Sequence, residues 1–304
     1  MSRGGSFMLD TKQERERFCK EFNISDERFR NARLTWEELE EIADDFNLKR
    51  NEHQNTVKQY AEIIRKCSYV HSLSYRVKMT THLIEKIIRK NAGYLKEGDS
   101  ISKGNYEEKL TDLIGIRILL LFKSDWIHVH NYLMNLYEDD LIEPPFAHIR
   151  KGDDDSIYKG KIQIKDNKPY RSIHYVIRAD NRLGLEIQVR TLYEEAWSEI
   201  DHKLRYPYNL QNEMLKNYID IMNRLTGVGD EMGTFINSYI RNFQENLLSG
   251  VHDDNEVYQF ILEEIKKCDN EDVRQAITDK IKQAENYCEV RKMSELLTQV
   301  LKYK

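Results

Sequence analysis

The stretch Leu113-Ile-Gly-Ile-Arg-Ile-Leu-Leu-Leu-Phe122 decides the fold class of this 304-residue chain. It is short, apolar and rich in branched side chains, which is typical of a strand buried inside a sheet. Gly184-Leu-Glu-Ile-Gln-Val-Arg190 predicts a second strand, in which apolar and polar side chains alternate. The alternation directs a carboxylate, an amide and a guanidinium to the same face of the sheet.

Outward from these two strands, the central part of the chain continues to mix strand and helix signals. We expect further strands over 157–164 and 171–178, and helices over 126–137 and 192–204. This order predicts an α+β fold, with a small mixed sheet and flanking helices.

Both ends of the chain have a helical periodicity. In the first 106 residues, Thr35 opens a helix with a capping box, and further helices are expected over 55–67 and 80–90. From Leu210 onward we expect helices, with an interruption at 227–230 and a turn at Gly250. The predicted organisation is an N-terminal helical region (1–70), a central domain (71–208) and a C-terminal helical extension (209–304).

Composition excludes some classes of protein. The net charge of −5 gives no overall attraction to nucleic acid or to acidic membranes, although a local basic groove stays open. The four cysteines are far apart and form no C-x-x-C pair, so neither a zinc site nor a disulfide framework is expected. Without a signal peptide or an apolar run long enough to span a bilayer, we expect a cytoplasmic protein that does not enter membranes.

Basic residues precede the first strand. Arg76 and Lys78 are two residues apart in an extended or helix-entry segment, and Lys86 follows on the next helix. A guanidinium can stack on a base, and an ammonium can neutralise phosphate oxygens. The plainer interpretation of this common pattern is a solvated basic patch.

Two acids and their neighbours are candidates for metal chemistry. Asp112 lies where the apolar strand begins, which suits a metal ligand or a simple cap equally well. Arg117 lies within the apolar run, where a cation is costly unless it is paired or bound to a ligand. Glu186 supplies a second carboxylate, and Arg190 can neutralise phosphate, unless the segment is only a salt-bridged sheet edge.

The segment 168–174, Lys-Pro-Tyr-Arg-Ser-Ile-His, offers an aromatic ring before a strand. Tyr170 can stack on a purine, while Ser172 and His174 alternate on one strand face. A lone tyrosine is more often part of a core, so this segment alone decides nothing.

Taken in order, four segments resemble the RelA/SpoT synthetase family, which makes the alarmones ppGpp and pppGpp. They are Tyr75-Arg-Val-Lys78, Asp112-Leu-Ile-Gly-Ile-Arg-Ile-Leu119, Tyr170-Arg-Ser-Ile-His-Tyr-Val-Ile177 and the run that begins Glu186-Ile-Gln-Val-Arg-Thr191 and ends at Pro207. The resemblance covers about Arg76 to Pro207 and implies a nucleotidyltransferase-like synthetase fold. It also implies attack of an acceptor 3′-hydroxyl on the β-phosphate of ATP, with release of AMP.

The resemblance further implies residue roles. Arg76, Lys78 and Lys86 would bind ATP, and Arg117 would stack on the adenine. Asp112 would hold Mg²⁺, and Glu186 would serve both the metal and the acceptor hydroxyl. Acceptor binding would fall to Tyr170, which stacks on guanine, and to its neighbours on the same strands, namely Arg171, Ser172, His174, Gln188 and Arg190.

Departures from the family pattern lie mostly on the acceptor side. Lys168-Pro169 replaces the usual Asn-Gly, His82 replaces a serine, and an acidic run occupies 153–155. Only His53 and His71 precede Arg76, so no upstream His-Asp hydrolase site is expected, and the chain resembles a small, synthetase-only member.

Three functions therefore stay open: a GDP or GTP pyrophosphokinase, a toxin that pyrophosphorylates the 3′ end of tRNA, and a degenerate regulatory module. A tRNA acceptor would need a basic surface, for which the candidates are Lys159, Lys161, Lys165, Lys168, Arg171 and the C-terminal lysines. The helical extensions would serve a homo-oligomer or an antitoxin-like protein partner.

Overall fold

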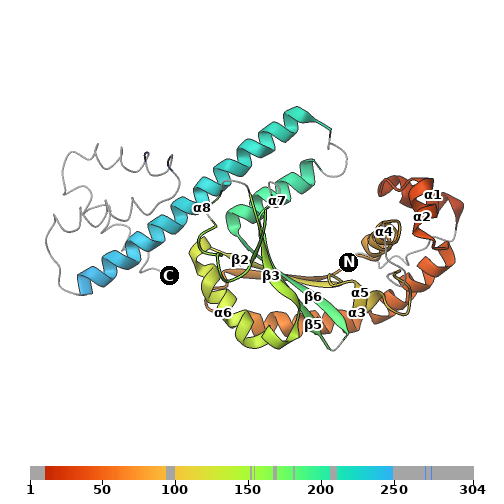
Figure 1. Cartoon of the computed structure of the whole chain (residues 1–304), viewed down its shortest axis with the longest axis horizontal. Coiled ribbons are helices and arrows are strands. Elements are labelled where there is room, and N and C mark those ends of the chain that lie inside the picture. Colours follow the sequence, from red (N-terminus) through yellow and green to blue (C-terminus); the bar gives the residue numbers. More distant parts are fainter. Residues whose placement is uncertain are drawn as a thin grey trace, which may run out of the picture. The chain divides into compact units, whose positions relative to one another are not determined.

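The computed structural model describes residues 11–93, 100–150, 153, 155–166, 170–180, 182–205, 211–248, 271 and 275. Its six-stranded sheet has the order β1-β2-β6-β5-β3-β4, with β5 and β6 antiparallel (Figure 1). This confirms the predicted α+β class. The strands are β1 Ser72–Val77, β2 Ile114–Leu120, β3 Leu141–Ile149, β4 Gln163–Asp166, β5 Ser172–Ala179 and β6 Leu183–Thr191.

Helices precede, interrupt and follow the strands in the described part of the chain. They are α1 Lys12–Glu21, α2 Asp26–Ala32, α3 Trp36–Ile64, α4 Thr80–Asn91, α5 Tyr106–Lys109, α6 Trp126–Tyr137, α7 Leu192–Leu204 and α8 Glu213–Leu248, with short 3₁₀ turns at Lys123–Asp125 and Glu138–Asp140.

The chain divides into two compact units. The first comprises Met1–Ile118, Asn131–Phe146 and Ile173–Val189, and the second comprises Leu119–His130, Ala147–Ser172 and Arg190–Lys304. Each unit is described below by itself. The three regions expected from the sequence, bounded at 70 and 208, stay a prediction.

Two helices of the first unit, α3 and α4, begin where the sequence predicts. Thr35 accepts a hydrogen bond from the Glu38 amide and caps α3 in a capping box. The separate helix expected over 55–67 is wrong, because α3 continues without a break to Ile64. No glycine or proline lies between Trp36 and Ile64 to end it. In α4, the expected apolar face is fully buried, as shown by Leu83, Ile84, Ile87 and Ile88.

The two deciding strands form as predicted. Burial alternates along β2, so the Arg117 side chain lies on the half-exposed face of the strand and not on its buried face. In β6, the side chains of Leu185, Ile187 and Val189 are fully buried on the opposite face from Glu186.

Two strands escaped prediction, and one was misplaced. β1 includes Arg76, for which an extended or helix-entry segment was expected, and β3 contains Pro144 and Pro145, which argue against a strand in a sequence pattern. The strand expected over 157–164 is wrong, because residues 156–161 form turns and β4 begins only at Gln163.

In the second unit, α8 runs unbroken for 36 residues beside α7 (Figure 1). The interruption predicted at 227–230 is therefore wrong. A β-carbon at Gly227 would lie 2.8 Å from the Arg171 side chain, and one at Gly229 would lie 2.8 Å from the Tyr193 ring. These glycines permit close packing against α8. The turn expected at Gly250 falls outside the described residues.

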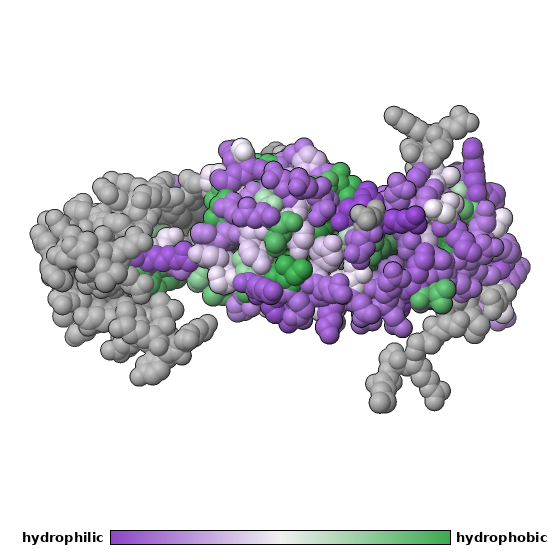
Figure 2. All heavy atoms as spheres, turned by 90° about the horizontal axis from the view of Figure 1, so that it is seen from below, coloured by the Kyte–Doolittle hydropathy of each residue, from purple (hydrophilic) through white to green (hydrophobic). Residues whose placement is uncertain are grey.

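Charged and polar side chains dominate the face shown in Figure 2. Among the described residues, no helix is both long and apolar enough to cross a membrane.

Candidate functional site

The first unit gathers two charged side chains around Asp112. The amide of Lys78, directly after β1, donates to the Leu113 carbonyl at 2.8 Å, which holds the end of β1 beside the segment that enters β2. Asp112 Oδ2 then accepts from Lys78 Nζ at 2.8 Å and pairs with Lys86 Nζ of α4 at 2.6 Å. Burial works against ionisation of Asp112, but the two ammonium groups outweigh it and lower the pKa of Asp112 to about 2.

A glycine allows this segment to pass close to β6. A β-carbon at Gly184 would lie 2.5 Å from the Thr111 Cα, a distance that no side chain tolerates. Because Thr111 adjoins Asp112, Gly184 lets the Asp112 carboxylate approach the strand that carries Glu186. The Asp112 charge reaches Glu186, where it favours the protonated form.

Neighbouring side chains hold the Glu186 carboxylate by both of its oxygens. His174 Nδ1 of β5 lies 2.9 Å from Oε1, and Gln188 Nε2 donates to Oε2 at 3.0 Å. Burial and the Asp112 charge raise the pKa of Glu186, whereas His174 and Gln188 lower it, and the net shift is downward. Glu186 is therefore ionised at neutral pH.

A pocket of about 100 Å³ opens on this face of the first unit. Its lining comes from β1, β2 and β6 and consists of Ser74, Tyr75, Arg76, Gly115, Ile116, Arg117, Glu186 and Gln188. Arg76 reaches over Gly115, whose missing side chain leaves room for it. The pocket thus combines two guanidiniums with a carboxylate.

The Asp112–Glu186 pair has the donor chemistry of a magnesium site. Mg²⁺ usually takes one or two carboxylates and completes its shell with water and phosphate oxygens. Asp112 Oδ1 is buried and has no hydrogen-bond partner among the described residues, so one oxygen stays available for a cation. In that same part of the chain, no cluster of three or more acidic, histidine or cysteine side chains forms a metal cage. The residues fit a magnesium ion shared with phosphates.

Arg190 supports Tyr170 in the second unit. The Arg190 guanidinium lies 4.7 Å from the Tyr170 ring centre and also donates to the Tyr170 hydroxyl. Glu195 and Ser198 of α7 hold the same guanidinium at 2.9 and 3.0 Å. His148 contacts the ring edge. Arg190 is buried in these contacts, so it positions the tyrosine instead of reaching for phosphate as expected.

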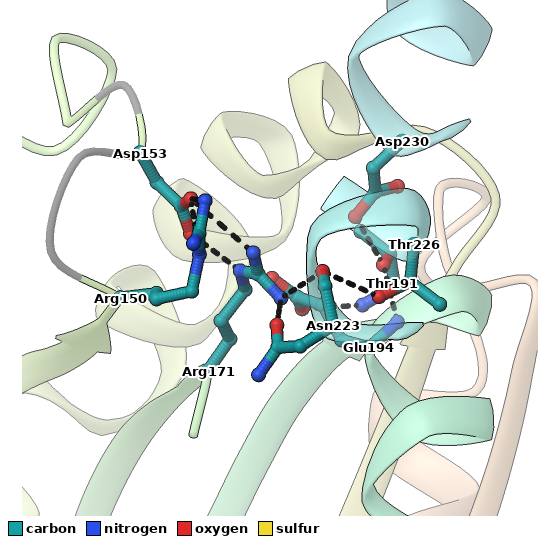
Figure 3. Close-up of polar contacts among 8 residues, drawn as sticks. All are labelled: Arg150, Asp153, Arg171, Thr191, Glu194, Asn223, Thr226 and Asp230. Atoms are coloured by element: carbon teal, nitrogen blue, oxygen red, sulfur yellow. Dashed lines mark hydrogen bonds and ion pairs between the residues drawn. The ribbon is translucent and has the colours of Figure 1, made fainter. Parts of the chain in front are cut away.

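Arg171 and Ser172 are also buried away from solvent. Asp153 joins Arg171 to Arg150, and Asn223 of α8 accepts from the Arg171 guanidinium (Figure 3). Ser172 has a buried hydroxyl with no hydrogen-bond partner among the described residues. Arg171 therefore ties α8 to the segment before β5, and its charge is already satisfied by Asp153.

The structure thus forms two bonded groups in the first unit, Lys78–Asp112–Lys86 and His174–Glu186–Gln188. Arg76 and Arg117 line the pocket beside Glu186. Tyr170 and Arg190 form a separate pair within the second unit. Sequence reasoning missed Phe146, His148, Glu195 and Ser198, because only three-dimensional contact connects them to the site. Lys168 and Pro169 fall outside the described residues.

Residues 75–211 match a family described as "Region found in RelA / SpoT proteins". The site residues from Arg76 to Arg190 fall within this range, whereas Ser74 of the pocket lining lies just outside it.

A curated relative, GTP pyrophosphokinase YwaC of Bacillus subtilis (strain 168), is 30% identical over 154 residues, which are 48% of this chain. The match covers 61% of that relative's own length.

Among solved structures, the small alarmone synthetase 1 from Bacillus subtilis is similar, with 21% identity and a TM-score of 0.49 over 66% of this chain and 99% of that one. The same synthetase bound to its product pppGpp has 21% identity and a TM-score of 0.47, over 62% of this chain and 95% of that one.

Proposed function

We propose that this protein is an alarmone synthetase, which transfers the β,γ-pyrophosphate of ATP to the 3′-hydroxyl of GDP or GTP. The 3′-oxygen forms a bond to the β-phosphorus, and the bond from that phosphorus to the α,β-bridging oxygen breaks. The products are AMP and ppGpp or pppGpp, and the hydroxyl proton passes to Glu186. The name of the curated relative supports this reaction.

Each part of the pocket has a role in this scheme. Arg76 and Arg117 line the pocket and bind the adenine end of ATP. Lys78 and Lys86 neutralise the polyphosphate, for which they exchange part of their pairing with Asp112. Such transfers depend mainly on positioning and on stabilisation of charge.

Asp112 and Glu186 would hold Mg²⁺, which neutralises phosphate charge when bound. Without a cation, the two carboxylates repel each other, as the effect of Asp112 on Glu186 indicates. Glu186 keeps one edge at the pocket and takes the acceptor proton there.

Tyr170 stacks on the acceptor guanine. The guanidinium of Arg190 occupies the space over its ring at 4.7 Å and fixes the ring plane. A ring fixed in this way loses less freedom when a base stacks on it.

One observation carries the proposal. Two bonded groups, Lys78–Asp112–Lys86 and His174–Glu186–Gln188, supply two carboxylates, two lysines and a histidine, and the pocket that Glu186 lines contains two arginines. If the charged residues formed only a structural ion pair, the pocket beside them would not be needed. If they formed only a solvated basic patch, the two carboxylates would not be needed.

The deciding experiment follows label from the terminal phosphate of ATP, with magnesium, in parallel reactions with GDP, GTP and deacylated tRNA. We expect label on GDP or GTP. Label on tRNA alone would replace this function with the toxin activity, and no transfer to any acceptor would favour the regulatory module.

Glu186→Gln is the matching variant. We expect loss of transfer by at least about 100-fold with an unchanged melting temperature, because the amide neither takes the proton nor binds the metal well. Unchanged activity would remove Glu186 from the mechanism.

Location and protein partners complete the proposal. We place the reaction in the cytoplasm, where its nucleotide substrates occur. An oligomer or an antitoxin-like partner stays a prediction, and the exposed apolar residues of α8 are the side chains to change in testing it, namely Met214, Tyr218, Ile221 and Leu225.

A further inference from the structure

His174 lies in the sheet beside Glu186. Its contacts there are with other protein side chains, and binding of an acceptor does not require them. Its side chain is buried, with 6% of the residue exposed. On β5 it pairs across the strands with Gln188 of β6, while Glu186 pairs with Val176. His174 and Glu186 are therefore diagonal neighbours on one face of an antiparallel pair, within reach of a side-chain hydrogen bond.

Phe146 of β3 fixes the plane of the imidazole. The two rings are stacked, with centres 4.9 Å apart and planes 5° apart. Stacking restricts the imidazole to one plane, and within this plane Nδ1 faces one neighbouring acceptor. That acceptor is Glu186 Oε1, at 2.9 Å.

The hydrogen bond also fixes which imidazole nitrogen carries the proton. An ionised carboxylate only accepts hydrogen bonds, so His174 Nδ1 must be the donor. Gln188 donates to the other carboxylate oxygen at 3.0 Å. The Glu186 side chain, which otherwise rotates about three bonds, is thereby held at both oxygens.

We propose that His174 is a positioning residue for Glu186: clamped on Phe146, it holds the carboxylate in the orientation that takes the acceptor proton. This assignment replaces direct acceptor binding by His174 and rests on the proposed function. Residues that orient a reacting or metal-binding carboxylate in this way typically change activity by about 10–100-fold when they are removed.

The kinetic test uses two variants of the same residue. His174→Leu removes the donor, and we expect kcat to fall by about 10–100-fold while the KM for ATP and for the acceptor stay within about twofold. His174→Asn keeps an N–H close to the position of Nδ1, and we expect it to recover most of the lost kcat.

His53 provides a matched control. Its Nε2 lies 3.2 Å from Glu107 Oε1 in a second His–Glu pair, which is built from α3 and α5, and neither residue lines the pocket. His53→Leu should lower the melting temperature while kcat and both KM values stay unchanged.

Several results would overturn the assignment. They are an unchanged kcat in His174→Leu, an equal defect in His174→Asn and His174→Leu, or an equal loss of kcat in His53→Leu. A rise confined to the acceptor KM would return His174 to acceptor binding.

A second readout does not depend on activity. In the wild-type protein labelled with ¹⁵N-histidine, two-bond ¹H–¹⁵N correlations should show a proton on His174 Nδ1, with the signal assigned by its loss in His174→Asn. A proton on Nε2 alone would overturn the proposal. If the wild type transfers pyrophosphate to no acceptor, the proposed function fails, and the spectrum still decides whether His174 donates to Glu186.

Discussion

At the scale of one residue, Asp112 shows how neighbouring ammonium groups keep a buried carboxyl ionised. The pKa of its carboxyl falls from an ordinary 3.8 to about 2, because two ammonium groups outweigh the cost of burial. A depressed carboxyl pKa adds stability that is fully present above pH 3.8 and is lost as the pH falls through about 2. Asp112 is therefore ionised throughout the range in which nucleotides are handled.

Asp112→Asn removes this ionic contribution and one metal ligand. We expect the variant to be less stable than the wild type by about 2 kcal/mol above pH 4, with the difference disappearing near pH 2. Transfer should fall by at least about 100-fold. Denaturant unfolding at several pH values measures the first effect. A difference in stability that grows below pH 4 would contradict the ion-pair account.

Arg117 offers a cleaner test of nucleotide binding. It lines the pocket from the half-exposed face of β2, so its loss costs little packing. Arg117→Met should raise the KM for ATP by about tenfold with a smaller change in kcat, since a lost cation–π contact is worth roughly 1–2 kcal/mol. Arg178→Met, on β5 outside the pocket, is the matched control. Equal effects of the two variants would exclude a specific role for Arg117.

The sequence predicts residues of the site better than it predicts their partners. Asp112 and Glu186 are recognisable because each lies at or within a strongly apolar strand. The contact of His174 with Glu186 depends on a cross-strand register, and that of Arg171 with Asn223 joins residues 52 positions apart. No local pattern encodes either contact. For this reason the sequence suggested Arg171 as an acceptor-binding residue, whereas the structure buries it against α8.

At the scale of elements, β6 and α7 were predictable, whereas α8 was predicted as helix but with a break that it does not have. Alternation over 184–190 and the Thr191–Glu194 capping box mark the change from strand to helix. In α8, Gly227 and Gly229 indicated a break, because glycine is unfavourable inside a helix. Close contacts with Arg171 and Tyr193 explain why the helix keeps them.

A buried carboxyl on α8 joins that helix to the start of α7. Thr191 Oγ1 donates to Asp230 Oδ2 at 2.5 Å, while Thr191 also caps α7 (Figure 3). Burial, with a contribution from the Glu194 charge, raises the pKa of Asp230 to about 8. The charged groups that act on it are Glu194, Lys123 and Arg171.

Asp230→Asn should therefore stabilise the protein at alkaline pH. A carboxyl whose pKa is raised on folding loses stability as the pH rises from about 3.8 to about 8, because the folded state binds the proton more tightly. The amide avoids this loss, so we expect a gain of roughly 1–3 kcal/mol at pH 9 and almost none at pH 4. Thermal unfolding at both pH values measures it. A variant that is less stable at pH 9 would show that Asp230 is ionised in the folded state.

At the scale of the whole molecule, the distribution of charge favours a small acceptor, GDP or GTP, over a large one, tRNA. A net charge of −5 leaves only a local surface to attract tRNA. Of the basic residues considered for that surface, Arg171 is buried against Asp153, and Lys159 pairs with Asp155 at 2.7 Å. The acidic run thus neutralises part of the surface that a polyanion would need.

Charge reversal at Lys159, Lys161 and Lys165 tests this argument directly. For GDP or GTP, we expect the triple change to glutamate to leave kcat/KM within about threefold, because a nucleotide is recognised inside the pocket. Binding of tRNA through 6–10 phosphates would instead lose about 10³–10⁵ in affinity between 50 and 200 mM salt. Reversal of three exposed lysines, Lys20 on α1, Lys58 on α3 and Lys66 in the turn after α3, controls for net charge alone. A loss of transfer that is specific to the first triple variant and grows steeply with salt would make the acceptor a nucleic acid. A weak salt dependence in both variants would leave GDP or GTP as the acceptor that fits this chain.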